Sequence, residues 1–152
     1  MPNGRTHRPA GALSGAAVAA YRAQHQKTAH MILETIGGAM GGWVGGQLPD
    51  HLEPADCWNH RKFCHSWAAF FAGASFSRAV VVGWERYCRE QAVSAANKRL
   101  ANASLSGGMS FFLLMLETAW RIAAGILAGL IAGYASHLIL DATTPSSLPV
   151  FG

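Results

Sequence analysis

Charged residues are scarce in this chain of 152 residues: 13% are Asp, Glu, Lys or Arg, whereas 51% are hydrophobic. Soluble domains usually contain about 25% charged residues, so we do not expect water to be the only solvent of this protein. The length is typical of one domain. We therefore expect a single helical domain over residues 1–152.

Cysteine is also rare. The three cysteines, Cys57, Cys64 and Cys88, leave one unpaired in any arrangement and do not resemble a secreted disulfide framework. A reducing compartment is therefore favoured. The first residues, MPNGRTHRPAG, contain no continuous apolar stretch, so we expect no cleaved signal peptide.

A basic stripe is absent too. The net charge is +4 and the pI is about 9.3, but the Lys and Arg residues are scattered along the chain without interleaved aromatic residues. Nucleic acid is therefore not expected as a partner. Anionic membrane lipid is the expected acidic neighbour.

No alternating strand pattern of useful length is present, and helical signals dominate. Pro9 suits the first position of a helix, Thr28 suits an N-cap, and Pro49 suits a stop. The predicted helices cover about residues 10–24, 28–47, 65–104 and 110–140, with a break at Gly107-Gly108. The predicted fold is all-α: an antiparallel four-helix bundle that is embedded in a membrane or associated with one.

Two predicted helices carry glycine at every fourth position. These glycines are Gly37, Gly41 and Gly45 in one helix, and Gly125, Gly129 and Gly133 in the other. Such ridges allow close helix packing in lipid, although tight packing inside a soluble bundle is an alternative. The segment Ile122–Leu140 contains no Asp, Glu, Lys or Arg and is close to the ~20 residues that cross a bilayer. We expect membrane insertion or deep association, with the number of spans open.

Five candidate metal ligands are expected to meet at one end of the bundle. In an antiparallel arrangement, the ends of the helices that carry them lie together. The candidates are His7, Asp50, His65, His137 and Asp141. Imidazole and carboxylate suit zinc and other divalent transition metals, and mixed sets are typical of catalytic sites. His137 and Asp141 share one helix face, so an ordinary hydrogen-bonded contact is the alternative for that pair alone.

The stretch Leu48–Ser66 concentrates further polar side chains. His60 and Arg61 are predicted to bind a substrate phosphate, since guanidinium matches phosphate oxygens; a loop entering the next helix, held by backbone contacts, is the alternative. Glu53 is a candidate general base, or a partner that orients a ligating histidine.

The same stretch allows a rival metal site, a closed zinc knuckle made of Cys57, His60, Cys64 and His65. Adjacent Cys64 and His65 would struggle to reach one tetrahedral ion, and a second C-x2-C half is absent. Thiol labelling with and without chelator distinguishes the two sites, because the cysteines of a knuckle are protected only while metal is bound.

Several segments, in this order, carry a family resemblance: THRPAGALSGA, LPDHLEPA, NHRKFCHS and GYASHLILDATTPSSLP. Together they resemble the LexA-regulated, inner-membrane-associated family of metal-dependent hydrolases. The resemblance covers nearly the whole chain and is weakest over residues 86–110. It implies a helical protein of the bacterial inner membrane with an unassigned substrate. The chain departs from the family pattern at Leu52, Lys62 and Cys64, where relatives have aspartate, glycine and threonine.

The order of the ligands is also similar to that of the all-helical zinc-dependent phospholipase C and single-strand nuclease group, in which the last aspartate bridges two metals. This similarity implies that Asp141 bridges two divalent ions, although one ion is also compatible. A metal-bound water of lowered pKa would then attack a phosphorus or carbonyl centre.

The sequence therefore predicts a membrane-associated, metal-dependent hydrolase. Zinc is the expected metal, and the expected substrate is a phosphoester, a lipid-like molecule or another small molecule. The alternative is a small non-catalytic membrane protein with a structural metal site. Its glycine-ridged helices would assemble with a partner or form a homo-oligomer.

Overall fold

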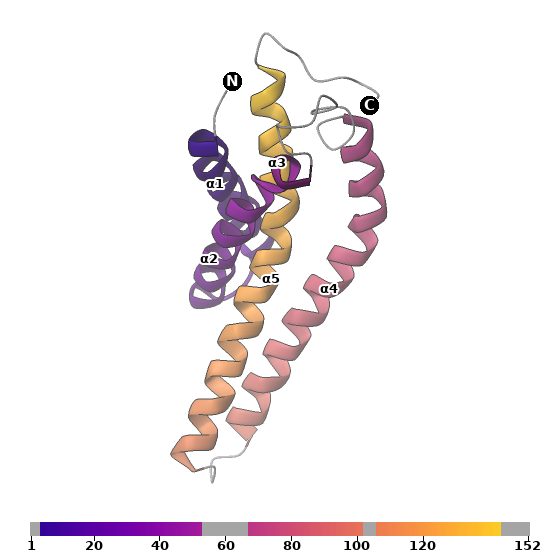
Figure 1. The fold of residues 1–152 in the computed structure, drawn as a ribbon. Coiled ribbons are helices and arrows are strands. Elements are labelled where there is room, and N and C mark those ends of the chain that lie inside the picture. The colour runs from indigo at the N-terminus through magenta and orange to yellow at the C-terminus, as the bar shows by residue number, and fades with distance from the viewer. Residues whose placement is uncertain (1–3, 53–66, 102–105, 144–152) are drawn as a thin grey trace.

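The computed structural model describes residues 4–52, 67–101 and 106–143, and within these ranges it contains helices and no strand. The helices are α1 (Gly4–Ala23), α2 (Thr28–Gly45), α3 (Leu48–Leu52), α4 (Trp67–Ala101) and α5 (Gly107–Ala142). Two antiparallel hairpins, α1–α2 and α4–α5, pack through α5 (Figure 1). The predicted all-α, antiparallel four-helix bundle is confirmed, with α3 as a short addition.

Two prolines lie differently from the prediction. Pro9 lies inside α1 rather than at its first position, because α1 already begins at Gly4. A proline this close to the start of a helix removes few backbone hydrogen bonds. Pro49 does follow the end of α2, but it also lies in the first turn of α3, where a missing N–H has no intrahelical partner to lose. One residue therefore both stops a helix and starts the next.

The expected break at Gly107-Gly108 is instead the first turn of α5. The side chain of Ser106 accepts a hydrogen bond from the backbone N–H of Met109 at 3.4 Å and so caps this helix. The predicted N-cap at Thr28 is also shifted by one residue: Thr28 is the first residue of α2, and Lys27 occupies the N-cap position.

Glycines let α2 lie against both α1 and α5 at backbone contact. A Cβ atom added to Gly41 would overlap the backbone carbonyl of Ile126 on α5, and one added to Gly42 would overlap that of Gly11 on α1. The same holds along both ridges predicted from the sequence. The ridges therefore pack against neighbouring helices of the same chain, and these faces are not available to a second copy.

A network of ion pairs joins the four long helices near the α1–α2 turn. Arg22 of α1 pairs with Glu85 of α4 at 2.6 Å, and Arg89 of α4 pairs with Glu34 of α2 at 2.6 Å. Arg121 of α5 also pairs with Glu34, at 3.2 Å. Glu34, Glu85 and Arg121 are buried. Close by, Glu117 of α5 pairs with His30 and with Arg99.

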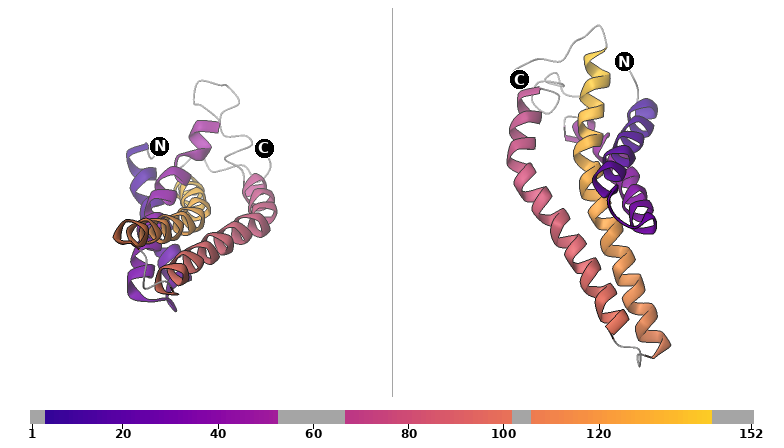
Figure 2. Two further views of the ribbon diagram at one scale, coloured as in Figure 1. Left: turned by 90° about the horizontal axis from the view of Figure 1, so that it is seen from below. Right: turned by 180° about the vertical axis from the view of Figure 1, so that it is seen from behind.

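The α4–α5 hairpin is longer than the α1–α2 hairpin and extends past the α1–α2 turn (Figures 1 and 2). At the other end of the bundle, the start of α1, the short α3 and the end of α5 lie together. Of the helices described, α5 is the one long and apolar enough to cross a membrane, by length and composition.

Candidate metal centre at the end of the helix rows

Three rows of small residues at every fourth position end at candidate ligands. On α5 the glycine ridge continues from Gly133 to His137 and then Asp141, and on α1 the row that contains Gly11 and Gly15 begins at His7. From Gly42 of α2, the same four-residue spacing continues through its C-cap residue Gly46 to Asp50 in α3. Residues four apart share one face of a helix. The rows that bring the backbones together therefore also direct these side chains to one point.

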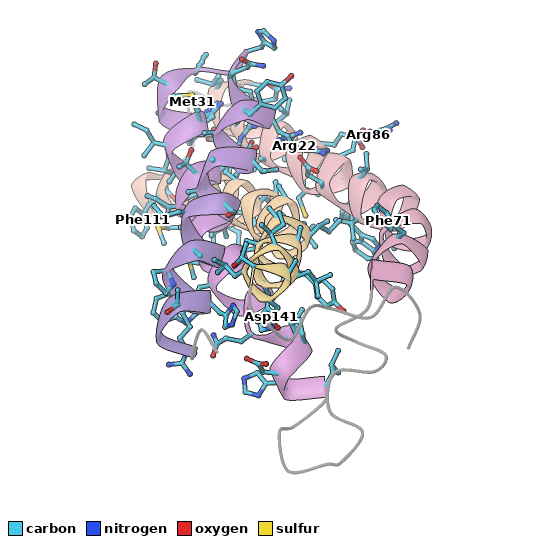
Figure 3. All side chains as sticks on the ribbon, turned by 90° about the horizontal axis from the view of Figure 1, so that it is seen from above. Arg22, Met31, Phe71, Arg86, Phe111 and Asp141 are labelled. Carbon is cyan, nitrogen blue, oxygen red and sulfur yellow. The ribbon has the colours of Figure 1, made fainter. Side chains whose placement is uncertain are left out.

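The four side chains lie within a few ångströms of one another. The Nε2 atom of His7 lies 3.4 Å from Oδ1 of Asp141, and Nε2 of His137 lies 3.4 Å from Oδ2 of Asp141. Asp50 Oδ1 lies 3.5 Å from Nε2 of His137. Ligand atoms from His7, Asp50 and His137 all lie within 4.8 Å of one another. Figure 3 looks onto this end of the bundle and labels Asp141 at the end of α5, beside α3.

The backbone of α2 orients one of the histidines. Nδ1 of His137 lies 2.8 Å from the carbonyl oxygen of Gly46. A carbonyl can only accept, so Nδ1 carries the hydrogen and donates it. In the neutral ring, Nε2 is then the atom with a lone pair for a metal. The close approach of α2 to α5 thus also fixes which nitrogen faces the carboxylates.

The rings of His7 and His137 stack, with centroids 3.9 Å apart and an interplanar angle of 21°. This stacking places both Nε2 atoms on the side of Asp141, one facing each carboxylate oxygen. A carboxylate that presents its two oxygens to two different partners has the geometry of a bridging ligand. The same geometry would also allow Asp141 and the two imidazole rings to bind a single ion.

Burial gives the cluster one open side. His7, His137 and Asp141 are buried, with exposed fractions of 2%, 0% and 1%. The side chain of Asp50 is 45% exposed. Among the residues that the structure describes, the cluster is therefore exposed on the side of α3.

The spacing of the polar atoms fits a divalent ion. Two ligands that each lie ~2.1 Å from a tetrahedral ion are ~3.4 Å apart, and the three N···O separations are 3.4, 3.4 and 3.5 Å. Charge-assisted hydrogen bonds between such groups are usually shorter, at about 2.7–2.9 Å. The donor set, two imidazoles and two carboxylates, is one that zinc accepts.

The structure thus brings together four of the five predicted ligands. The fifth, His65, and the predicted substrate-side residues Glu53, His60 and Arg61 lie outside the described residues, as do Cys57 and Cys64 of the rival knuckle. Ligation itself remains a prediction for all five. The carbonyl of Gly46 was not predicted, although the row of small residues that runs into Asp50 was visible in the sequence.

His30 and Glu34 share a helix face but belong to a different part of the molecule. His30 pairs with Glu117 at 3.1 Å, and Glu34 pairs with two arginines of α4 and α5. Both residues lie in the ion-pair network at the opposite end of α2. They are therefore structural contacts between helices and do not contribute to the His–Asp cluster.

The fold and the cluster together define an all-α protein with a His–Asp centre at one end of its bundle and one helix able to span a membrane. The chain belongs to the YdjM inner membrane protein family, whose sequence model matches residues 1–152. No curated protein and no solved structure matches the chain. Membership confirms the predicted inner-membrane class, and the family description names no reaction.

Proposed function

We propose that this inner membrane protein is a metal-dependent hydrolase whose centre is the His–Asp cluster. His7, Asp50, His137 and Asp141 would hold one or two divalent ions, zinc being the expected metal, and His65 is the fifth candidate. The proposed substrate is a phosphoester or a lipid-like molecule. The expected location is the bacterial inner membrane.

The observation that carries this proposal is the convergence of two imidazoles and two carboxylates from α1, α3 and α5 at ligand-like separations. Buried carboxylates and imidazoles usually lie where they have a partner or a function. The glycines behind them bring the helix backbones into direct contact, and packed helices position a site more accurately than loops do.

A bound divalent ion would supply a water of lowered pKa and would stabilise negative charge on a reacting oxygen. The residues of the chain have separate roles around it. The Gly46 carbonyl keeps the Nε2 atom of His137 directed at the cluster. Asp141 holds the two rings at a fixed separation. The exposed Asp50 lines the side from which a substrate enters.

A closed structural metal site is the second candidate, and one observation favours it. Four protein ligands are enough to complete a tetrahedral site, as in structural zinc centres. In that case the protein would bind metal without hydrolysing anything. The exposure of Asp50 favours the open site instead, because a ligand in contact with solvent can be exchanged or displaced.

The metal content of the purified protein tests the site itself. We expect Asp141→Ala and His65→Ala to lose most of the bound metal measured by elemental analysis. Glu90→Ala and His25→Ala are matched controls, because both side chains are exposed on other parts of the bundle, and both should keep it. Full metal in both Asp141→Ala and His65→Ala would exclude the proposed centre.

Activity separates the two candidates. Wild-type protein loaded with zinc is tested against a panel of phosphodiesters and phospholipids, alongside Asp50→Ala. Turnover that is lost in Asp50→Ala but kept in Glu90→Ala supports the hydrolase. A folded, metal-loaded protein that is inert on every class tested supports the structural site.

A further inference from the structure

A groove lies where α1, α4 and α5 meet, and its volume is about 180 Å³. One wall is a face of α5 that includes Leu127, Ile131 and Ala135, which spans ~12 Å at ~1.5 Å per residue. Ile131 and Ala135 are each two positions from Gly133 and so point ~160° away from it around the helix. Gly133 contacts α2 and belongs to the row that ends at Asp141. The groove is therefore separate from the His–Asp cluster.

The groove is charged at one end and apolar along the rest of its length. Arg22 of α1 and Glu85 of α4 line the end beside the ion-pair network. One turn further from the network, the lining residues are Val18 of α1 and Val81 of α4, since residues four apart share one face of a helix. This lining matches an amphiphile, a molecule with an apolar chain and a polar or charged head.

The charged end contains more guanidinium groups than carboxylates. Glu85 is shared by Arg22 and Arg89, at 2.6 and 2.8 Å, and Glu34 is shared by Arg89 and Arg121. Two carboxylates thus serve three guanidinium groups. The side chain of Arg121 is 5% exposed and that of Arg22 is 36% exposed. The surplus positive charge is therefore most accessible at Arg22, which lines the groove.

The same excess of positive charge extends over this end of the molecule. Residues 22–34 and 85–121 contain seven Lys or Arg residues and four carboxylates. The basic residues are Arg22, Lys27, Arg86, Arg89, Lys98, Arg99 and Arg121, and the carboxylates are Glu34, Glu85, Glu90 and Glu117. The field at the charged end therefore favours an anionic head over a zwitterionic or cationic one.

The size of the groove limits what can occupy it. An apolar cavity of ~150 Å³ holds one benzene molecule and no ordered water, so this groove suits a short stretch of alkyl chain. A helix of a second copy is too wide, at about 10–12 Å with its side chains. Phospholipid is the amphiphile that surrounds a member of an inner membrane family. An unfilled groove would also leave the lining atoms without van der Waals partners.

We propose that this groove is a binding site for one molecule of an anionic phospholipid. One acyl chain lies along α5 between Ala128 and Ala135, against Val18 and Val81, and the phosphate is bound by Arg22. Guanidinium matches phosphate oxygens in geometry and charge. In an apolar solvent, packing and charge rather than hydrophobicity select the ligand. The site does not depend on whether the His–Asp cluster is catalytic.

Native mass spectrometry of the whole protein in detergent tests the site. Delipidated protein is titrated with dioleoylphosphatidylglycerol, which is anionic, and with dioleoylphosphatidylcholine, which is zwitterionic. The wild-type chain should bind one phosphatidylglycerol, and phosphatidylcholine about fivefold more weakly, the usual effect of one basic residue on an anionic lipid. Glycerol 3-phosphate, a head without a tail, should not compete at equal concentration.

Variants separate the contributions of tail and head. Ala132→Leu fills the groove and should lower the affinity for both lipids about tenfold or more, whereas Ala119→Leu, on an exposed face of α5, should not. Arg22→Gln should abolish the preference for phosphatidylglycerol. Arg86→Gln should keep it, because Arg86 points away from the bundle (Figure 3). Circular dichroism checks folding, and Ala135→Leu replaces Ala132→Leu if that variant does not fold.

Three results would overturn the proposal. The first is equal binding of the two lipids by the wild-type protein, or a preference that Arg22→Gln retains. The second is full lipid affinity in both groove-filling variants, and a dimer that these variants convert to a monomer would then assign the groove to a second copy of the chain. The third is competition by glycerol 3-phosphate at equal concentration, which would assign the site to free phosphate compounds.

Discussion

Glu34 is the carboxylate on which the ion-pair network depends. It is fully buried and accepts from Arg89 at 2.6 and 3.0 Å and from Arg121 at 3.2 Å. Burial alone would lower the pKa of Arg89, but the hydrogen bond and the charge of Glu34 raise it above the ordinary arginine value. Arg89 is therefore charged, and removing Glu34 takes a carboxylate partner from Arg89 and from the buried Arg121.

We predict that Glu34→Ala lowers the free energy of unfolding by about 3–5 kcal/mol, the usual result of breaking a buried ion pair from one side. The measurement is an SDS unfolding titration of the protein in mixed micelles. Glu90→Ala, which removes an exposed carboxylate, should change it by ~0.5 kcal/mol or less. Similar losses in both variants would mean that the network does not hold the helices together.

Part of the His–Asp cluster could be predicted from the sequence, residue by residue. The spacing of His137 and Asp141 predicts a shared helix face, and their place at one end of the bundle predicts the meeting with His7 and Asp50. The Gly46 carbonyl could not be predicted, because it is a backbone group that depends on how closely α2 approaches α5. The partners of Glu34 were equally hidden, since they come from helices distant in the sequence.

The rows of small residues connect the packing of the helices to the candidate metal site, because they end at the candidate ligands. A Cβ added at Gly42 would overlap the backbone of α1, and α2 carries the carbonyl that holds His137. Any change that separates these helices should therefore also displace His137 relative to the rest of the His–Asp cluster.

Gly42→Ala is expected to destabilise the protein by about 1–3 kcal/mol, since overpacking forces the backbones apart. Gly83→Ala is the matched control, because within the described part of the chain the added Cβ meets no neighbouring helix or side chain within 4 Å. That variant should be unchanged or up to ~1 kcal/mol more stable, as alanine is a better helix former than glycine. Thermal unfolding in detergent compares the two. Equal stability of both variants would contradict the close packing.

The four long helices and their order could be predicted from the sequence, but their limits could only be approximated. Pro9 lies inside α1, Lys27 rather than Thr28 is the N-cap of α2, and Gly107-Gly108 begins α5. Helix α3 could not be predicted, because Pro49 is equally a stop signal for one helix and a start signal for the next. The row in α1 that begins at His7 has the same period as the two glycine ridges, so it could have been found by extending the search from glycine to alanine.

For the whole molecule, the low charge and the family membership lead to a simple expectation. We predict that the protein stays in the membrane fraction after washing with high salt and with alkaline carbonate, and that detergent is needed to release it. Integral proteins resist both washes because their apolar faces contact hydrocarbon, whereas electrostatic attachment is screened by salt. Release by carbonate would show that the protein is peripheral.

The rows of small residues that end at His7, Asp50, His137 and Asp141 also limit how the chain can change in length. One residue inserted between Gly133 and His137 would keep the composition and hydropathy of α5, yet it would turn both ligands by ~100° around the helix. Substitutions on the outer faces leave this register intact. Insertions and deletions inside the rows should therefore be far less tolerated than substitutions on the outer faces.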